Sequence, residues 1–139
     1  MSEHQEKKRL ENPPKSIKFK IQRREKEGSN AYWETFELPY RRNLNVISAL
    51  MDIRKNPVTV EGKQTTPPVW DMSCLEQVCG ICTMIIDGRV RQSCSALIDD
   101  LLLERLERKA SPQHLEDVKH LVADQKHDTC GIIASFHFA

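Results

Sequence analysis

The chain has 139 residues, 39% of them hydrophobic, and a formal net charge of +1. This length is enough for one domain with a modest core, and the near balance of charge gives no bulk electrostatic reason to expect nucleic-acid binding. Apolar runs such as 84–86 and 101–103 are far too short to cross a bilayer, and the charged first residues lack the apolar segment of an export signal. We therefore expect a cytoplasmic protein that reaches a membrane only through partners.

A polar segment, 1–15, opens the chain and ends in two prolines, which predicts a disordered tail. Residues 17–22 then alternate strictly between apolar and polar side chains, which is the period of a half-buried β-strand. A second strand is predicted over 33–40, and the polar loop between the two favours an antiparallel hairpin. We expect Trp33 to pack rather than to bind a ligand. The side chains predicted to share the inward face are Ile17, Phe19, Ile21, Phe36, Leu38 and Tyr40.

A helix is predicted to begin after Asn45, which can cap it, and to end at the pair Asn56 and Pro57. Its apolar residues fall on one helical face, which we expect to lie across the apolar side of the hairpin. These residues are Val46, Ile47, Leu50 and Met51. The proline- and threonine-rich stretch 58–69 that follows is predicted to be a loop.

Four cysteines come next with the spacing C-x4-C-x2-C and a more distant fourth member: Cys74, Cys79, Cys82 and Cys94. This is the ligand spacing of plant-type [2Fe–2S] centres. Three thiolates so close in sequence can wrap a small cluster only if the loop between them curls tightly, and the fourth ligand must come from elsewhere in the fold. Gly80 lies inside the loop, where a missing Cβ lets the backbone approach a sulfur and direct an N–H group at it.

Asp87 and Gly88 lie between two apolar runs, which predicts a β-hairpin with a two-residue turn. Such a hairpin carries Cys94 back toward the loop of the first three cysteines. The predicted order is then strand, strand, helix, cysteine loop and hairpin. This is the order of a β-grasp domain, so we expect an α+β fold.

Two other roles of the cysteines stay open. Structural zinc usually takes its ligands as two separate close pairs, whereas three of these four cysteines come from one loop. Disulfides need an oxidising compartment, and the N-terminal segment carries no export signal that would lead there. A fifth cysteine, Cys130, stands alone and is not expected to be a ligand.

After Leu101 the pattern becomes helical. Helices are predicted over 101–109 and 112–126, and the second is opened by a serine–proline pair at 111–112. Residues 132–138 have the apolar character of a strand. The histidines His120 and His127 match no metal-ligand spacing with Cys130, so we expect no site there.

The segments that flank the cysteines are 43–50 before the motif, 70–74 at its entry and 91–98 at its close. Together with the cysteine spacing they resemble the N-terminal ferredoxin-like domain of the iron–sulfur subunit of succinate dehydrogenase/fumarate reductase, in the form found in Gram-positive, menaquinone-using bacteria. The resemblance covers 17–101. Gln77 stands where many members have glycine and Asp71 where many have arginine, which bears on the potential of a cluster more than on its presence.

The resemblance implies that a further strand after Cys94, parallel to the first and next to it, completes the sheet. In the family a linker and a second domain with two more clusters follow, but the cysteine pattern of that domain is absent here. We therefore interpret the chain as a truncated or frame-altered copy, divergent after Leu101. The domains expected are a disordered tail over 1–15, a [2Fe–2S] ferredoxin-like domain over 16–101 and a mostly helical tail over 102–139. We expect 132–138 to lie beside 17–22, with the two helices as the crossover.

The resemblance further implies that the chain relays electrons between a flavoprotein subunit and quinone through a [2Fe–2S] cluster held by the four cysteines. It has no catalytic acid or base of its own. It would be peripheral to the inner face of the cell membrane through the flavoprotein and membrane-anchor subunits, and we expect the rim at 76–81 to face the flavoprotein. The alternative is a zinc-binding fold with no redox role or a non-functional fragment.

Overall fold

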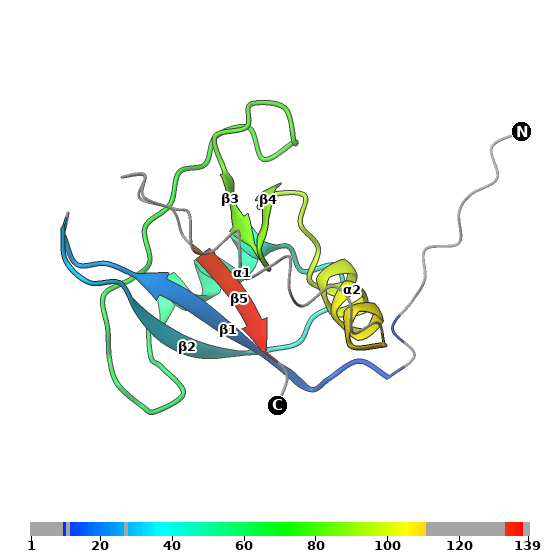
Figure 1. Cartoon of the computed structure of the whole chain (residues 1–139), viewed down its shortest axis with the longest axis horizontal. Helices are drawn as coiled ribbons and strands as arrows, with labels where there is room; N and C mark the ends of the chain where they lie inside the picture. Colours follow the sequence, from blue (N-terminus) through cyan, green and yellow to red (C-terminus); the bar gives the residue numbers. More distant parts are fainter. Residues whose placement is uncertain (1–9, 11, 27, 111–132, 138–139) are drawn as a thin grey trace, which may run out of the picture.

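The protein is described here by a computed structural model, which describes residues 10, 12–26, 28–110 and 133–137. Within these residues, five strands form one sheet in the order β2-β1-β5-β3-β4, and two helices complete an α+β fold (Figure 1). The predicted fold class is therefore confirmed. The elements in chain order are β1 Ser16–Arg23, β2 Tyr32–Pro39, α1 Val46–Lys55, β3 Thr83–Ile86, β4 Arg89–Gln92, α2 Ile98–Ala110 and β5 Ile133–His137.

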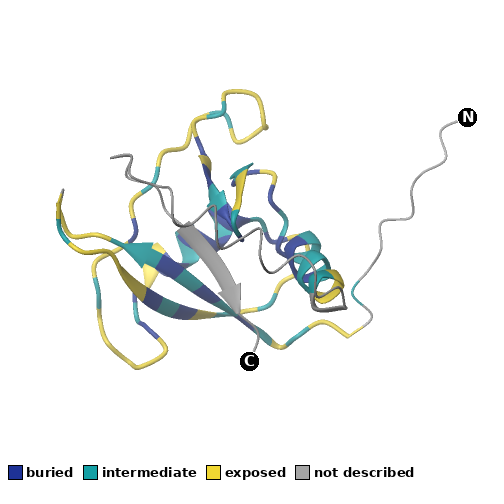
Figure 2. Ribbon diagram, viewed as in Figure 1, coloured by how far each residue is buried: buried dark blue, intermediate teal, exposed yellow. Residues whose placement is uncertain are grey.

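The first hairpin forms as predicted, with strand boundaries one residue from those expected. β1 pairs antiparallel with β2 in a register that sets Phe19 opposite Phe36. Burial alternates along β1, and one face of the hairpin enters the core (Figure 2). Trp33 is on the other face, 40% exposed, where the Lys20 ammonium lies 5.4 Å from the centroid of its ring. This tryptophan therefore packs on the surface and not in the core.

Helix α1 begins and ends where the sequence predicts. The Asn45 side chain accepts a hydrogen bond from the Ser48 N–H at 2.8 Å, which satisfies one of the donors left free at a helix start. Of the predicted apolar face of α1, Val46 and Leu50 pack in the core with the first hairpin. Ile47 and Met51 pack in a separate cluster with Cys82 and Cys94. The buried members of the larger core are Ile17, Phe19, Ile21, Phe36, Leu44, Val46, Ala49, Leu50, Ile53, Met84, Ile86, Ala96, Ile98, Leu101 and Leu102.

The loop that leads toward the cysteines is fastened by hydrogen bonds to an ion pair within the first hairpin. Arg23 and Glu34 lie 3.5 Å apart, and the Thr65 hydroxyl donates to the Glu34 carboxylate at 2.8 Å. Arg23 also donates to the carbonyl and the hydroxyl oxygens of Thr66 at 2.9 and 2.8 Å. A buried pair of this kind is supported only when further hydrogen bonds surround it, and here the loop supplies them. The predicted loop at 58–69 thus has a fixed path.

Strand β5 fills the position between β1 and β3, as predicted for 132–138. The pairing residues include Lys18 opposite His137 and Ile21 opposite Ala134. The expectation that the completing strand runs parallel to the first is wrong, because β5 is antiparallel to β1 and parallel to β3. Its longer ladder, four residue pairs against two, is the antiparallel one, which is the slightly more stable kind per residue.

Helix α2 begins at Ile98, three residues before the predicted start. Asp99 in its first turn accepts hydrogen bonds from the Tyr40 hydroxyl at 2.7 Å and the Asn43 N–H at 3.1 Å. Burial, followed by the hydrogen bond to Asp99, raises the pKa of Tyr40. An acidic residue at a helix N-terminus is also favoured by the helix dipole. The predicted helix over 112–126 and the predicted disordered tail, apart from its last residues, lie outside the described residues.

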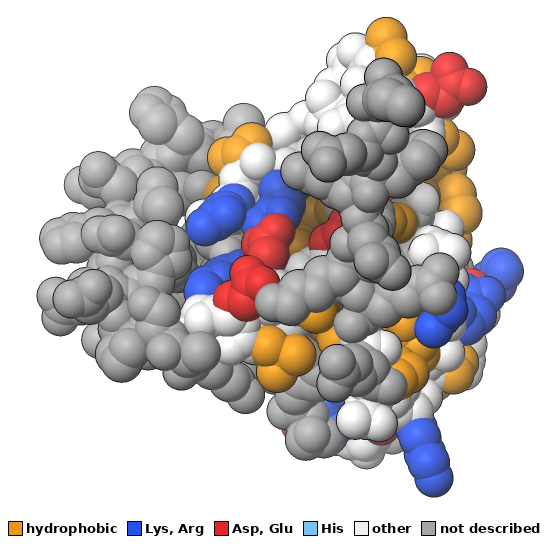
Figure 3. All heavy atoms as spheres, turned by 90° about the vertical axis from the view of Figure 1, so that its right-hand side faces the viewer, with side chains coloured by type: hydrophobic (Ala, Val, Ile, Leu, Met, Phe, Trp, Pro, Cys, Tyr) orange, Lys and Arg blue, Asp and Glu red, His pale blue; other side chains and the backbone are white. Residues whose placement is uncertain are grey.

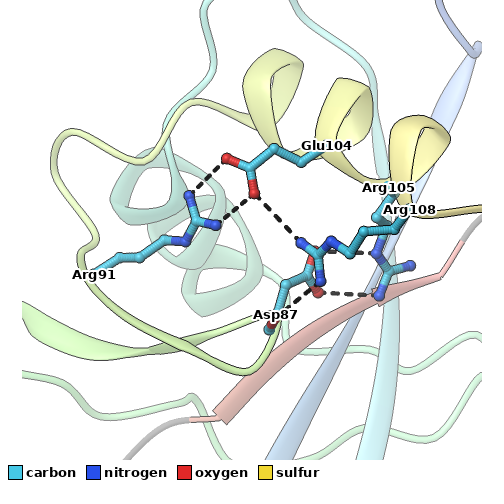
Figure 4. A network of polar contacts seen from close by, with 5 residues as sticks. All are labelled: Asp87, Arg91, Glu104, Arg105 and Arg108. Carbon is cyan, nitrogen blue, oxygen red and sulfur yellow. Dashed lines mark hydrogen bonds and ion pairs between the residues drawn. The ribbon is translucent and has the colours of Figure 1, made fainter. Parts of the chain in front are cut away.

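The second hairpin has the predicted two-residue turn. Asp87 and Gly88 have φ values of 52° and 76°, so both adopt the left-handed conformation that matches the twist of the flanking strands. Arg105 on α2 reaches this turn and donates to both carboxylate oxygens of Asp87 at 3.0 Å (Figure 4). Arg108 donates to the backbone carbonyl of Asp87 at 3.3 Å. The turn is therefore attached to α2 at both its side chain and its backbone.

Glu104 extends the same network to strand β4. Its carboxylate accepts two hydrogen bonds from Arg91, at 3.0 and 2.5 Å, and one from Arg108 at 3.3 Å (Figure 4). The hydrogen bonds from Arg91 lower the pKa of Glu104, so this carboxyl stays ionised in the folded protein. Arg91 precedes Cys94 by three residues, and the network thus holds the segment that delivers the fourth cysteine.

Within the described residues, no helix has the length and hydrophobicity that a membrane span requires.

We expect Arg105→Met to lower the free energy of unfolding by about 3 kcal/mol, because it strips two charge-assisted hydrogen bonds from a buried carboxylate. Urea unfolding followed by far-UV circular dichroism measures this change. The matched control is Arg108→Met, which removes weaker contacts to the same turn and should cost about 1 kcal/mol. Equal effects of the two substitutions would contradict the assignment of Asp87 and Arg105 as the main attachment.

Candidate functional site

The second hairpin brings the third and fourth cysteines together. Cys82 directly precedes β3, and Cys94 lies two residues after β4. Thr83 pairs with Gln92 at the open end of the hairpin, and the next residue pair continues the ladder, since the Ser93 N–H donates to the Cys82 carbonyl at 3.1 Å. Both cysteines are buried. The turn at 87–88 therefore fixes their separation through the strand register.

Asn45 holds the backbone at Cys94 from the other side. Its side-chain amide donates to the Cys94 carbonyl at 3.1 Å, while its side-chain oxygen caps α1. The Val46 N–H donates to the Ala96 carbonyl at 3.0 Å next to it. One asparagine thus couples the start of α1 to the position of the fourth cysteine.

The loop at 74–82 turns its backbone N–H groups toward sulfur. The N–H groups of Glu76 and Cys79 each donate to the Cys74 sulfur at 3.4 Å. Leu75 and Gln77 have φ values of 59° and 61°, the left-handed conformation that is rare for residues with a side chain. In this conformation the backbone turns the N–H groups of Glu76 and Cys79 toward the Cys74 sulfur. The loop is the green segment above β3 in Figure 1.

Gly80 also has a left-handed backbone, with φ of 72°. A Cβ placed there would meet only the Thr83 hydroxyl, at 3.9 Å, so space does not demand a glycine. Thr83 closes the turn by donating from its hydroxyl and its N–H to the Gly80 carbonyl at 2.6 and 3.2 Å. The left-handed backbone at Gly80 therefore explains this glycine, and the expected close approach of the backbone to a sulfur does not.

The N–H groups make Cys74 acidic. Hydrogen bonds from the backbone at Glu76, Cys79 and Val78, together with the Cys79 side chain, lower the pKa of Cys74 to about 6. A thiolate is the form that binds metal, so the loop favours the binding form of this ligand at neutral pH.

Cys82 and Cys94 share a hydrogen bond. Burial acts to raise the pKa of Cys82, but hydrogen bonds from the backbone and side chain of Cys94 and from Ser93 outweigh it and lower the pKa. Burial and the contact with Cys82 raise the pKa of Cys94, against a hydrogen bond from the Gln77 backbone. In the absence of metal, the Cys94 thiol is therefore the donor and the Cys82 sulfur the acceptor.

These contacts group the predicted ligands as two pairs, Cys74 with Cys79 and Cys82 with Cys94. Cys94 also feels the charge of Cys74, so the two pairs lie within electrostatic reach of each other. All four are free thiols. Among the described residues, no three histidine, cysteine or acidic side chains gather closely enough for a single metal ion. The convergence of all four sulfurs on one cluster stays a prediction.

Other predicted and unpredicted residues can now be placed. His120, His127 and Cys130 lie outside the described residues. Sequence reasoning identified Asn45 as a helix cap but missed its bond to Cys94, and it missed Ser93 altogether. The signal for Ser93 was present, because counting pairs back from the two-residue turn sets residue 93 opposite residue 82.

The chain is similar in sequence to known proteins. A family model described as "2Fe-2S iron-sulfur cluster binding domain" matches residues 18–129. The chain is also 62% identical over 87 residues to the "Succinate dehydrogenase iron-sulfur subunit" of Bacillus subtilis (strain 168). The aligned region is 63% of this chain and 34% of that protein, so the chain spans about a third of the length of the curated relative it matches.

In cluster-free protein, Cys74 should react with iodoacetamide with a midpoint near pH 6, because the thiolate is the nucleophile and its pKa is lowered to about 6. An ordinary cysteine has its midpoint at about pH 8.5. Alkylation rates between pH 5 and 9, read from the peptide masses, measure the difference. Cys74→Ser should remove the low-pH phase, and N-acetylcysteine treated alongside gives the unshifted reference. A single midpoint at the reference value would contradict the assigned N–H···S contacts.

Proposed function

Because the chain belongs to the family of 2Fe-2S iron-sulfur cluster binding domains, we propose that Cys74, Cys79, Cys82 and Cys94 are the ligands of its [2Fe–2S] cluster. Support comes from the C-x4-C-x2-C spacing, the grouping of the thiols as two pairs, and the N–H groups aimed at the first sulfur. Two pairs of thiolates suit two iron atoms, and the N–H donors offset the negative charge that four thiolates bring.

We propose that the chain acts as an electron-transfer iron–sulfur subunit of succinate dehydrogenase/fumarate reductase. The observation that carries this proposal is the 62% identity over 87 residues to a protein of that name. When bound, the cluster supplies one-electron redox chemistry. The chain's residues supply its position and electrostatics: α1 and the second hairpin hold Cys94 and Cys82, and the strained loop holds Cys74. No residue of the chain is assigned a role in proton transfer or nucleophilic attack.

In such a complex, succinate oxidation and quinone reduction take place on different subunits. Oxidation of succinate to fumarate releases two electrons and two protons at a flavoprotein subunit, and quinone takes up two electrons and two protons. This chain would pass the electrons between them one at a time. It would act in the cytoplasm at the inner face of the cell membrane, held there by the flavoprotein and membrane-anchor subunits.

The second candidate is structural zinc on the same four cysteines. A structural zinc site needs all four thiolates around one ion, whereas the matching family model describes a domain that binds a two-iron cluster. We therefore favour the [2Fe–2S] cluster.

Serine substitution at each cysteine tests the ligand set. Each of the variants Cys74→Ser, Cys79→Ser, Cys82→Ser and Cys94→Ser should lose most of the iron and visible absorption that the full chain takes up on anaerobic reconstitution, because such a centre is held by four thiolates and each substitution removes one. Cys130→Ser is the matched control and should load like the parent chain. Iron and sulfide assays with visible spectra give the readout. A parent chain that stays colourless and takes up zinc instead would overturn the proposal.

The rim of the cysteine loop carries the apolar surface that a partner would cover. Leu75, Val78 and Ile81 are all exposed, and Val78 is 79% exposed. At the top of the view in Figure 3, apolar side chains and an acidic one lie open on the surface. Exposed apolar residues gathered around one functional loop mark an interaction site more strongly than scattered ones do. We propose that the rim at 76–81, with Leu75 beside it, faces the flavoprotein subunit.

Val78→Asp should weaken binding to the flavoprotein subunit about tenfold, because it places a charge in an apolar contact. Val90→Asp is the matched control: Val90 is 74% exposed but lies next to the turn at the opposite end of the second hairpin from Cys82. Titration of both variants by biolayer interferometry compares the two. An equal loss of affinity, or a loss only at Val90, would place the contact elsewhere.

A further inference from the structure

Helix α1 divides its apolar side chains between two clusters, and the smaller cluster contains two of the candidate ligands. Ile47 is 3% exposed and packs with Cys82 and Cys94, and the half-buried Met51 packs against the same group. Residues four apart on a helix lie one above the other on the same face, so Ile47 and Met51 form one apolar surface, called here the apolar wall. The ligand assignment gives neither of them a role.

The apolar wall has a fixed position, because the start of α1 is bonded to the segment that carries Cys94. The Asn45 side-chain amide donates to the Cys94 carbonyl at 3.1 Å, and the Val46 N–H donates to the Ala96 carbonyl at 3.0 Å. A helix held at this point also holds Ile47, two residues further along the chain than Asn45. The wall is therefore built into the site by the same contacts that position the fourth cysteine.

The four candidate ligands differ in their access to water. Cys82 and Cys94 are buried, whereas Cys74 is half-buried and Cys79 is exposed. The apolar wall thus lies on the drier side of the site. Solvent access is one of the properties that set the potential of an iron–sulfur centre, so side chains that exclude water from two ligands bear directly on its redox chemistry.

We propose that Ile47 and Met51 exclude water from Cys82 and Cys94, and thereby lower the reduction potential of the centre and slow the loss of its iron. The inference rests on the proposed function, since it assumes that these cysteines are ligands. Reduction adds one negative charge, and apolar surroundings disfavour the more negative form because no water solvates it. Both residues act through the ligands, and they are positioning residues rather than ligands themselves.

Leu50 provides a matched control on the same helix. It has no exposed surface, but it packs in the core with the first hairpin and not in the cluster of Cys82 and Cys94. Its truncation to alanine leaves a cavity in the main core, so Leu50→Ala should lower the thermal stability of the chain more than Met51→Ala does. An effect of general destabilisation should therefore be larger at Leu50, whereas an effect of water exclusion should appear only at the apolar wall.

The test uses the full chain after anaerobic reconstitution, with Met51→Ala, Met51→Leu, Leu50→Ala and the double variant Ile47→Ala/Met51→Ala. Redox titration followed by electron paramagnetic resonance gives the midpoint potential, and the decay of visible absorption in excess iron chelator gives the rate of iron loss. Thermal unfolding of the cluster-free proteins gives the structural effect.

Met51→Ala should raise the reduction equilibrium constant roughly threefold, a shift of about 28 mV to more positive potential for one electron, because water then reaches the ligand sulfurs. It should speed the loss of iron by a similar factor. The double variant should shift further in the same direction. Met51→Leu restores an apolar side chain of similar size and should keep the parent potential, as should Leu50→Ala.

The outcomes separate this inference from the proposed function. If Met51→Ala and the double variant load the cluster at the parent potential, the inference alone is overturned, and an equal shift in Leu50→Ala overturns it too. Met51→Ala decides where the double variant does not load. If Met51→Ala takes up no cluster, loading of Met51→Leu at the parent potential supports the need for an apolar side chain there, and failure of both overturns the inference. A parent chain that binds no cluster overturns the proposed function.

Discussion

The register of the second hairpin is the constraint on which the candidate site depends. The side chains of a strand alternate between two faces, so a slip of one residue would move Cys94 away from Cys82 and turn the buried Ile86 out of the core. The two left-handed residues at 87 and 88 allow one register only. A residue other than glycine in that conformation stores strain, which persists where surrounding contacts over-determine it. The contacts of Asp87 with α2 do this, so helix packing and ligand geometry form one mechanical unit.

The cysteine loop has a different role, because it stabilises negative charge at the protein surface. It does so by bending the backbone at Leu75 and Gln77 into a conformation that costs roughly 1 kcal/mol or more at each residue. This conformation surrounds the Cys74 sulfur with N–H donors, which keep that sulfur ionised near neutral pH. The strain is thus offset most fully when the thiol is deprotonated or bound to metal. A loop of this kind is better suited to holding an anionic group than to packing a neutral thiol.

Most of the framework follows from local sequence signals, since each predicted element within the described residues has its own periodicity, cap or turn. The first strand pair, α1 with Asn45, and the turn at 87–88 need no information from distant residues. Features that depend on tertiary contacts were not predictable in this way. The start of α2 is set by contacts of Asp99 with Tyr40 and Asn43, which are far apart from it in sequence. Strand direction was missed for the same reason, because the apolar pattern of 132–138 reads equally well in either direction.

The direction of β5 decides where the chain leaves the sheet. Ile133 pairs with Ile85 in β3, and the strand then runs past the level of the turn at 87–88. His137 therefore lies about seven residues of strand rise from the level of Cys82, which is roughly 23 Å. A strand in the same position but parallel to β1 would finish at the cysteine end instead. The reversed strand thus sets its last residue, His137, beyond the turn end of the second hairpin and away from the level of the candidate ligand Cys82.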